Sequence, residues 1–217
     1  MNPGYRLLLT FTLLLNSVLS LAQTPPKREF RGVWIATVTN LDWPSSRGSD
    51  PSIQRSQLTT ILDGLKIAGM NAVVFQVRPE CDALYPSTIE PWSYWLTGQQ
   101  GKAPASPFDP LQFALDEAHK RGMEIHAWFN PYRVERVAGN YTLAPNHVAV
   151  LHPDWVIQMG TYRFLDPGKR AVWDYVSTVI ADVVRRYDID AAHIDDYFYQ
   201  DGISTQARPA RGGWSGR

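Results

Sequence analysis

The chain alternates strand-like and helix-like segments, and the loops after its strands are much longer than the loops after its helices. Four runs have the composition of buried strands, and three of them are followed by a helical pattern of apolar residues. This alternation predicts right-handed βαβ units and a parallel sheet. The expected strands are 31–38, 71–77, 124–129 and 191–194, and the expected helices are 52–68, 110–122 and 169–187.

The unequal loops distinguish between two folds with parallel sheets. Long loops at the carboxyl ends of the strands are how a (β/α)8 barrel of the TIM type builds its site. A doubly wound sheet is the alternative, but no glycine-rich phosphate-binding turn follows the first strand. Since a closed barrel needs eight strands, we expect an α/β fold of the (β/α)8 TIM-barrel type with only about the first four strands present.

The two ends of the chain differ from its middle. Residues 1–22 have the layout of a secretory signal, with Arg6, an apolar run and small residues before a cleavage point after Ala22. An uncleaved anchor is the alternative, although the run is shorter than the roughly 20 residues of a spanning helix. We expect 23–201 to form the N-terminal half of a barrel, and 202–217 to be an irregular Arg/Gly-rich tail that reflects truncation or a shifted reading frame. The expected location is periplasmic or secreted.

Composition excludes several classes of partner. Lys+Arg and Asp+Glu are both 21, so no net charge draws the chain to nucleic acid or, after signal cleavage, to a membrane surface. Cys81 is the single cysteine, which rules out an internal disulfide and a cysteine-based metal site. We expect neither a cofactor nor a resident metal.

The alternation of side chains along each strand predicts which residues face the barrel interior. A purely structural barrel would fill the inward positions with Val, Ile and Leu. Here many of them are polar or aromatic, and buried polar groups imply a ligand that shares their hydrogen bonds. The expected inward set is Trp34, Gln76, Arg78, His126, Trp128, Asn130, His193 and Asp195.

Carboxylates at the strand ends suggest glycoside chemistry. A glycosidase needs one carboxylate to stabilise or trap an oxocarbenium-like centre and another group to donate a proton. We predict Asp195 as nucleophile or electrostatic stabiliser, with Asp196 facing the other way and orienting Arg or Tyr neighbours. Glu80, or a residue on further strands, would donate the proton. Capping of loops or pairing with arginine is the alternative role for Asp195 and Asp196.

Further residues are expected at the rim of the barrel. Tyr132 and Arg133 follow the third strand and Tyr197 follows the fourth, where they would contact a substrate, although the first two can equally pair with carboxylates of the same loops. Trp92 and Trp95 either stack on sugar rings or pack the second loop. 

Two inward histidines raise the question of a metal. His126 and His193 could bind a metal beside Asp195, but the chain has no His-x-His pair, and single histidines on strands more often hydrogen-bond their neighbours.

Long blocks of the sequence resemble one family. The blocks RGVWIATVTNLDWPS, VVFQVRPECDALYPS, FDPLQFALDEAHKRGMEIHAWFNPYRV and HIDDYFY are similar to the glycosyl-hydrolase-like barrel family of bacterial envelope proteins. This family includes a division-associated hydrolase of peptidoglycan glycan strands. The resemblance implies a (β/α)8 barrel, an extracytoplasmic location and a glycan substrate.

The residues and the resemblance together favour hydrolysis of bacterial envelope glycans, with peptidoglycan strands as the expected substrate and a retaining route. A glycan-binding module without turnover and a metal-dependent polysaccharide deacetylase are the alternatives. Half a barrel would also expose strand edges, so we expect self-association through them.

Overall fold

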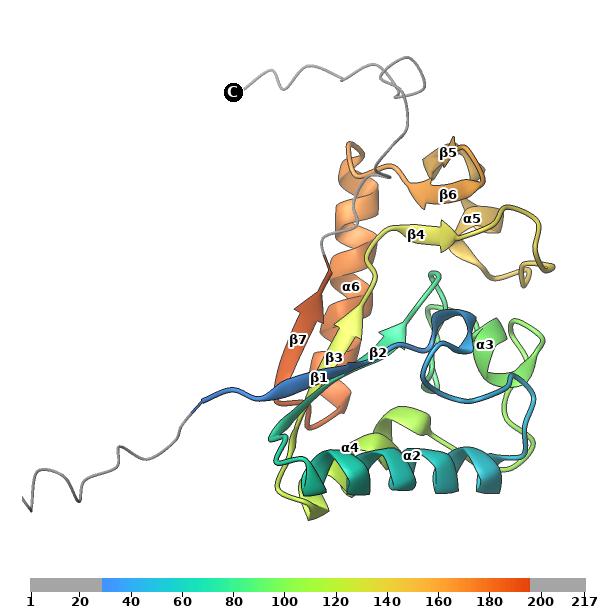
Figure 1. Ribbon diagram of the computed structural model, residues 1–217. Helices are drawn as coiled ribbons and strands as arrows, with labels where there is room; N and C mark the ends of the chain where they lie inside the picture. The colour runs from blue at the N-terminus through green and yellow to red at the C-terminus, as the bar shows by residue number, and fades with distance from the viewer. Residues whose placement is uncertain (1–28, 196–217) are drawn as a thin grey trace, which may run out of the picture. The chain divides into compact units, whose positions relative to one another are not determined.

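The computed structural model describes residues 29–195, so the expected signal segment and the Arg/Gly-rich tail lie outside the described residues. Within the described residues, the chain from Arg31 to Asp195 is one unit, built around a parallel sheet in the order β1-β2-β3-β7 (Figure 1). Its strands are β1 (Gly32–Ile35), β2 (Ala72–Arg78), β3 (Glu124–Phe129) and β7 (Ala191–Ile194). The predicted parallel sheet is therefore confirmed.

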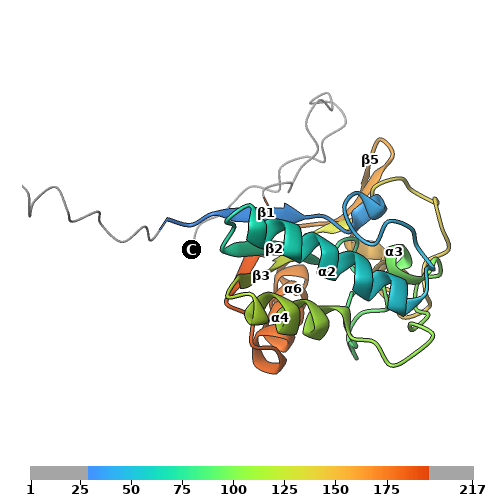
Figure 2. The same cartoon turned by 60° about the horizontal axis from the view of Figure 1, so that its bottom comes forward.

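The long helices of the described chain all cover one face of this sheet. They are α2 (Pro51–Ile67), α4 (Pro110–Lys120) and α6 (Arg170–Arg186), and Figure 2 shows them on the same side of the strands. Val73, Phe75 and Ile125 project from the strands into this layer, as the alternation predicted. A doubly wound sheet carries helices on both faces, so the one-sided cover and the sequential strand order match a segment of a barrel.

The helix ends follow from capping residues. The Asp50 side chain accepts a hydrogen bond from Ser52 N at 2.8 Å and starts α2, with Pro51 in its first turn. Asp109 starts α4 in the same way, by accepting from Gln112 N at 3.1 Å. Gly122 follows α4 with a φ of +64°, a left-handed conformation that favours glycine. These signals explain why both helices begin and end close to the predicted residues.

Strand β1 is shorter than predicted. It ends at Ile35, and Val38–Asn40 forms the 3₁₀ turn η1. The side-chain oxygen of Gln76 accepts hydrogen bonds from the backbone N–H groups of Thr37 and Val38, both at 2.9 Å. Because these donors bind a side chain of β2, they are not available to continue a strand ladder.

A second, antiparallel sheet lies within the long loop that follows β3, and sequence reasoning missed it. Its order is β4-β6-β5, with β4 (Arg133–Glu135), β6 (Tyr162–Leu165) and β5 (Val156–Met159). Figure 1 shows this small sheet beyond the carboxyl ends of β3 and β7. The short helical segments α3 (Tyr94–Thr97), α5 (Val148–Leu151) and η2 (Pro153–Trp155) also lie in the loops after strands.

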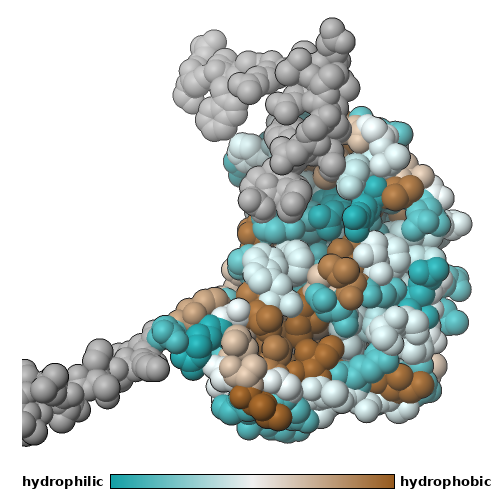
Figure 3. All heavy atoms as spheres, viewed as in Figure 1, coloured by the Kyte–Doolittle hydropathy of each residue, from teal (hydrophilic) through white to brown (hydrophobic). Residues whose placement is uncertain are grey.

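The face of the parallel sheet opposite the helices carries the remaining strand side chains. Ala36, Val74 and Trp128 form a small apolar cluster there. Figure 3 shows a hydrophobic area over the strands and a hydrophilic area near β4. This face of the sheet is therefore apolar over the strands and polar toward their carboxyl ends, near β4.

Candidate active site

Asp195 and Asn130 meet at the carboxyl end of the parallel sheet. Each follows a strand, β7 and β3, and these strands are paired neighbours. Asn130 Nδ2 donates to Asp195 Oδ2 at 3.1 Å, and both residues are buried, with Asp195 8% exposed. Asn130 Oδ1 accepts from the backbone N–H of Arg133 at 2.8 Å. The amide thus fixes a carboxylate at the place where a barrel carries its chemistry.

Gln76 and Trp128 lie opposite each other on β2 and β3, on the face away from the helices. Gln76 Nε2 and Trp128 Nε1 are buried donors without a hydrogen-bond partner among the described residues. A buried donor that stays unpaired costs about 1–3 kcal/mol. These two atoms are therefore candidates for binding acceptor oxygens of a ligand.

Three aromatic rings lie together on the same face. The Trp34 ring meets Trp128 edge-to-face at a centroid distance of 4.6 Å and meets His193 at 4.4 Å. Trp34 remains 47% exposed. An exposed indole on a polar-edged face can stack on the apolar face of a sugar ring. We call the set Trp34, Gln76, Trp128, Asn130, His193 and Asp195 the open face.

Arg78 does not join the open face, contrary to the sequence prediction. The register of β2 against β3 shifts between Gln76 and Arg78, so the simple alternation fails at this point. The Arg78 guanidinium is fully buried and bonds both carboxylate oxygens of Glu90, at 2.8 to 3.0 Å from Nε, while Tyr175 Oη on α6 donates to the same carboxylate. Carbonyls of Asn130 and Pro131 accept from its Nη1. Arg78 is a structural ion-pair residue.

His126 also lies away from Asp195. It occupies the first half of β3, and its Nε2 lies 3.2 Å from Glu124 Oε2. His193, by contrast, is on the open face beside Trp34. The two histidines therefore do not converge with Asp195, and the described residues contain no group of three His, Cys, Asp or Glu placed to hold a metal. The geometry gives no support to the deacetylase alternative.

Glu80 is not placed as a proton donor, which corrects a second prediction. Its carboxylate is buried and accepts three hydrogen bonds, from Trp95 Nε1 at 2.8 Å, Tyr141 Oη at 2.7 Å and Arg136 N at 2.7 Å. Trp95 is consequently buried and unable to stack on a sugar. These side chains hold the loops after β2 and β3 together.

Asp82 is a buried carboxyl that sequence reasoning did not single out. Burial, followed by the negative charge of Glu80, raises the pKa of Asp82 to about 7. Asp82 Oδ2 accepts from Gln100 Nε2 at 3.0 Å and from Tyr94 N at 3.2 Å. No local pattern reveals this carboxyl, since its partners come from a distant part of the loop. We call Glu80, Asp82, Trp95, Gln100 and Tyr141 the loop network.

Tyr132 and Arg133, which were predicted to lie at the rim, have different environments. Tyr132 packs against the second apolar cluster, which contains Val134 and Leu165. Arg133 is half-buried and opens β4, and burial lowers its pKa while the charges of Asp195 and Glu80 oppose this change. Cys81 is fully buried, and burial raises the pKa of its thiol to about 12, which keeps it protonated and unreactive. 

The other two predicted residues, Asp196 and Tyr197, lie outside the described residues. Within residues 29–195, no helix combines the length and apolar character needed to cross a bilayer.

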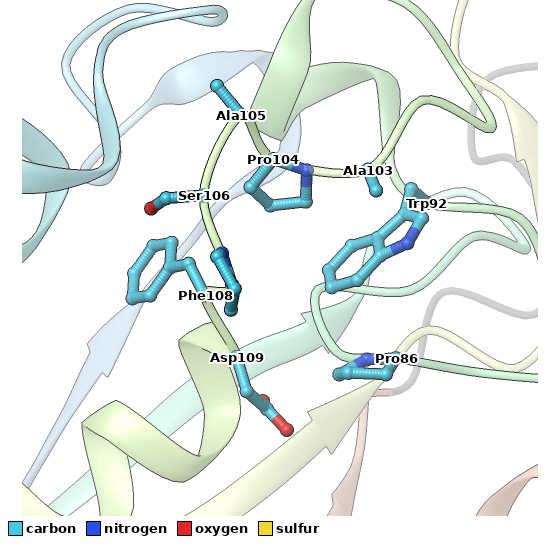
Figure 4. A pocket seen from close by; sticks show the side chains of 9 residues that line it. Pro86, Trp92, Ala103, Pro104, Ala105, Ser106, Phe108 and Asp109 are labelled. Carbon is cyan, nitrogen blue, oxygen red and sulfur yellow. The ribbon is translucent and has the colours of Figure 1, made fainter.

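A separate surface hollow of about 500 Å³ lies beside the loop that leads into α4 (Figure 4). Trp92 and Pro86 face Pro104 and Phe108 across it. Of its two polar side chains, Ser106 and Asp109, the carboxylate of Asp109 is already occupied as the α4 cap and as acceptor from Tyr187 Oη. Trp92 is thus the tryptophan of this loop that remains available at the surface.

Comparison with known proteins identifies the family. The model of the family described as glycosyl hydrolase-like 10 matches residues 29–210. The chain belongs to this family. It is 46% identical over 197 residues to glycosyl hydrolase YngK of Bacillus subtilis, covering 89% of this chain and 38% of that protein. It is 44% identical over 185 residues to glycosyl hydrolase DigH of Escherichia coli, covering 78% and 42%. The chain spans about two fifths of the length of these relatives.

Solved structures support the fold. An α-L-fucosidase isoenzyme from Paenibacillus thiaminolyticus aligns with a TM-score of 0.50 and 16% identity, over 77% of this chain and 23% of that one. A hypothetical protein from Ruminiclostridium thermocellum aligns with the same TM-score and 13% identity, over 75% of each chain. At these identities, the likeness to solved structures concerns the fold alone. Membership of the glycosyl hydrolase-like family points to a glycan-related, hydrolase-like role.

Proposed function

We propose that the protein hydrolyses glycans of the bacterial envelope, with peptidoglycan glycan strands as the substrate. The observation that carries the proposal is the buried Asp195 carboxylate, held by Asn130 at the carboxyl end of a parallel sheet in a glycosyl hydrolase-like chain. The expected export signal at residues 1–22 supports action in the periplasm or outside the cell, where such glycans lie.

Asp195 is the nucleophile or electrostatic stabiliser in this proposal. A retaining glycosidase uses one carboxylate to form and stabilise the glycosyl intermediate and a second group to protonate the leaving oxygen. The Asn130 amide fixes the direction of the Asp195 carboxylate, because it donates to one of the two oxygens. Since Glu80 is engaged by three donors, the proton comes from a residue outside 29–195, with Asp196 and Tyr197 in the adjoining segment as rim residues.

The open face supplies binding to the sugar. Trp34 offers an exposed ring, and Gln76 Nε2 and Trp128 Nε1 are donors without a protein partner in the described chain. A sugar has hydroxyl oxygens to accept from such donors and an apolar face to stack on an indole. This face favours a saccharide over a purely apolar or purely ionic ligand.

Hydrolysis of purified peptidoglycan strands without stem peptides tests the proposal. Asp195→Asn is expected to lower the release of reducing sugar ends by about 10³-fold or more, since a nucleophile lost from a catalytic set has an effect of this order. Asp174→Asn is the matched control, because Asp174 lies exposed on α6 and its side chain pairs, within residues 29–195, only with Arg170. Unchanged release by the Asp195 variant would remove Asp195 from the mechanism.

A binding module without turnover is the second candidate, and the exposed Trp34 is the observation that favours it. Co-sedimentation with peptidoglycan, without release of any sugar ends by the unmodified protein, would support binding alone. Release of sugar ends that depends on Asp195 would exclude it.

A further inference from the structure

Arg133 is linked to the candidate carboxylate through the side chain of Asn130. The backbone N–H of Arg133 donates to Asn130 Oδ1 at 2.8 Å, and Asn130 Nδ2 donates to Asp195 Oδ2 at 3.1 Å. Arg133 also opens β4, in which the next residue, Val134, is fully buried in the second apolar cluster. Arg133 itself is half-buried, whereas Val134 and Glu135 after it are buried.

Among the described residues, the Arg133 guanidinium lacks the carboxylate partner that Arg78 and Arg163 have. Arg78 bonds Glu90, and Arg163 bonds Glu135 at 2.7 Å. Within residues 29–195, the Arg133 side chain forms no ion pair and no hydrogen bond. A half-buried guanidinium has lost much of its hydration, so leaving it without an acceptor is costly.

The nearby carboxylates do not meet this need. Glu80 already accepts three hydrogen bonds, Asp195 Oδ2 accepts from Asn130, and neither carboxylate forms an ion pair with Arg133 among the described residues. Their charges act on Arg133 without a direct contact, and Arg136, three residues farther on, adds a second positive charge. An arginine side chain stays protonated at every physiological pH. The rim beside Asp195 therefore holds a fixed positive charge whose hydrogen-bond donors have no acceptor among residues 29–195.

We infer that Arg133 binds a carboxylate carried by the sugar beside Asp195, so that the site selects an acidic glycan. A guanidinium presents paired N–H groups that fit a carboxylate, and such charge-assisted bonds are the stronger class of hydrogen bond. Trp34 and the two unpaired donors would hold the neutral part of the same ligand. This inference rests on the proposed function and names the substrate class of that site.

Two forms of one glycan test this specificity. Peptidoglycan strands without stem peptides carry free carboxylates, and amidation with carbodiimide and ammonia neutralises them without changing the backbone. The unmodified protein is expected to show kcat/KM about 10- to 100-fold higher on the free strands, the range of one charge-assisted contact. Arg133→Gln is expected to remove that preference by lowering only the rate on free strands, and Arg133→Lys to keep part of it.

Arg170→Gln is the matched control, since it removes the same charge from an exposed position on α6 and should leave the preference unchanged. Thermal unfolding of each variant checks folding; the Arg133 side chain bonds no described residue, so little change is expected. Equal rates on both glycans by the unmodified protein would overturn the inference and leave hydrolysis intact. An equal loss on both glycans in Arg133→Gln would also overturn it and would make Arg133 a positioning residue for Asp195.

Hydrolysis of neither glycan would contradict the proposed function instead. Co-sedimentation with the same two glycans then decides the inference by itself. Preferential binding of the free strands that is lost in Arg133→Gln supports it, and equal binding of both forms, or no binding, overturns it.

Discussion

The loop network and the open face both place polar side chains at the carboxyl ends of the strands, but they differ in how fully the described residues satisfy the hydrogen bonds of these side chains. Glu80 accepts three hydrogen bonds within the protein, whereas Gln76 Nε2 and Trp128 Nε1 have no acceptor among the described residues. A saturated buried group stabilises the fold, and an unsaturated one is available to a ligand. Polarity at a strand end is thus a weak sign of a binding site until its partners are counted.

The largest expected effect comes from breaking the buried ion pair behind the loop network. Glu90→Gln leaves the Arg78 guanidinium without its counter-charge in a fully buried position. The free energy of unfolding should fall by about 3–5 kcal/mol in urea titrations. The exposed pair of Arg170 and Asp174 offers a control, since Asp174→Asn should cost below about 1 kcal/mol. A cost below about 1 kcal/mol for Glu90→Gln would mean that the pair is not structural.

The next largest effects come from one tryptophan of each region, Trp95 in the loop network and Trp34 on the open face. Trp95→Ala removes a buried ring that donates to Glu80, so it should destabilise the protein by about 3–5 kcal/mol. Trp34→Ala removes a half-exposed ring and should cost far less stability, while weakening glycan binding by about 10-fold, the scale of one aromatic stacking contact. Urea unfolding and co-sedimentation measure the two effects. Equal losses of stability in both variants would contradict the distinction between a structural loop network and a ligand-binding open face.

The pH dependence of stability tests the loop network from another side. Burial and Glu80 raise the pKa of Asp82 to about 7, whereas the unfolded chain has the ordinary value near 4. Between about pH 4 and 7 the folded protein therefore holds a proton that the unfolded chain has released, so this contribution is fully present below about pH 4 and is lost as the pH rises to about 7. Asp82→Asn should flatten that fall in urea titrations across the range.

The exposed Asp116 on α4 gives a control for this experiment, because Asp116→Asn should leave the fall unchanged. A fall of the same size in the Asp82 variant would assign it to other groups.

The smallest effects concern the two histidines of the parallel sheet. His126 pairs with Glu124 near the start of β3, so His126→Gln should leave kcat/KM for glycan strands within about 2-fold and stability within about 0.5 kcal/mol. His193 contacts Trp34 on the open face, so His193→Gln should weaken glycan binding more than the His126 change does. A larger kinetic loss from His126 would move the ligand toward the amino ends of the strands.

Sequence patterns predicted the structure correctly wherever it depends on residues that are close together in the chain or on neighbouring strands. The strand and helix positions followed from apolar periodicity and from capping residues such as Asp50 and Asp109. Alternation along β3 and β7 correctly brought Asn130 and Asp195 together, because neighbouring parallel strands end at the same edge.

The errors arose where distant segments decide the outcome. The register shift after Gln76 has no sequence signal, yet it turns Arg78 toward Glu90. The partners of Glu80 come from 15 and more residues away, including Tyr141 at a separation of 61. Strands of three or four mixed residues, as in β4, give too short a pattern to recognise a small sheet.

The Asn130 side chain connects two separate parts of the molecule mechanically, because its one amide group forms a hydrogen bond to each of them. Its oxygen holds the first residue of the small sheet, and its nitrogen holds the carboxylate of the last described strand. A displacement of β4 away from β7 would strain or break one of these two bonds. The orientation of the Asp195 carboxylate is therefore coupled to the position of β4.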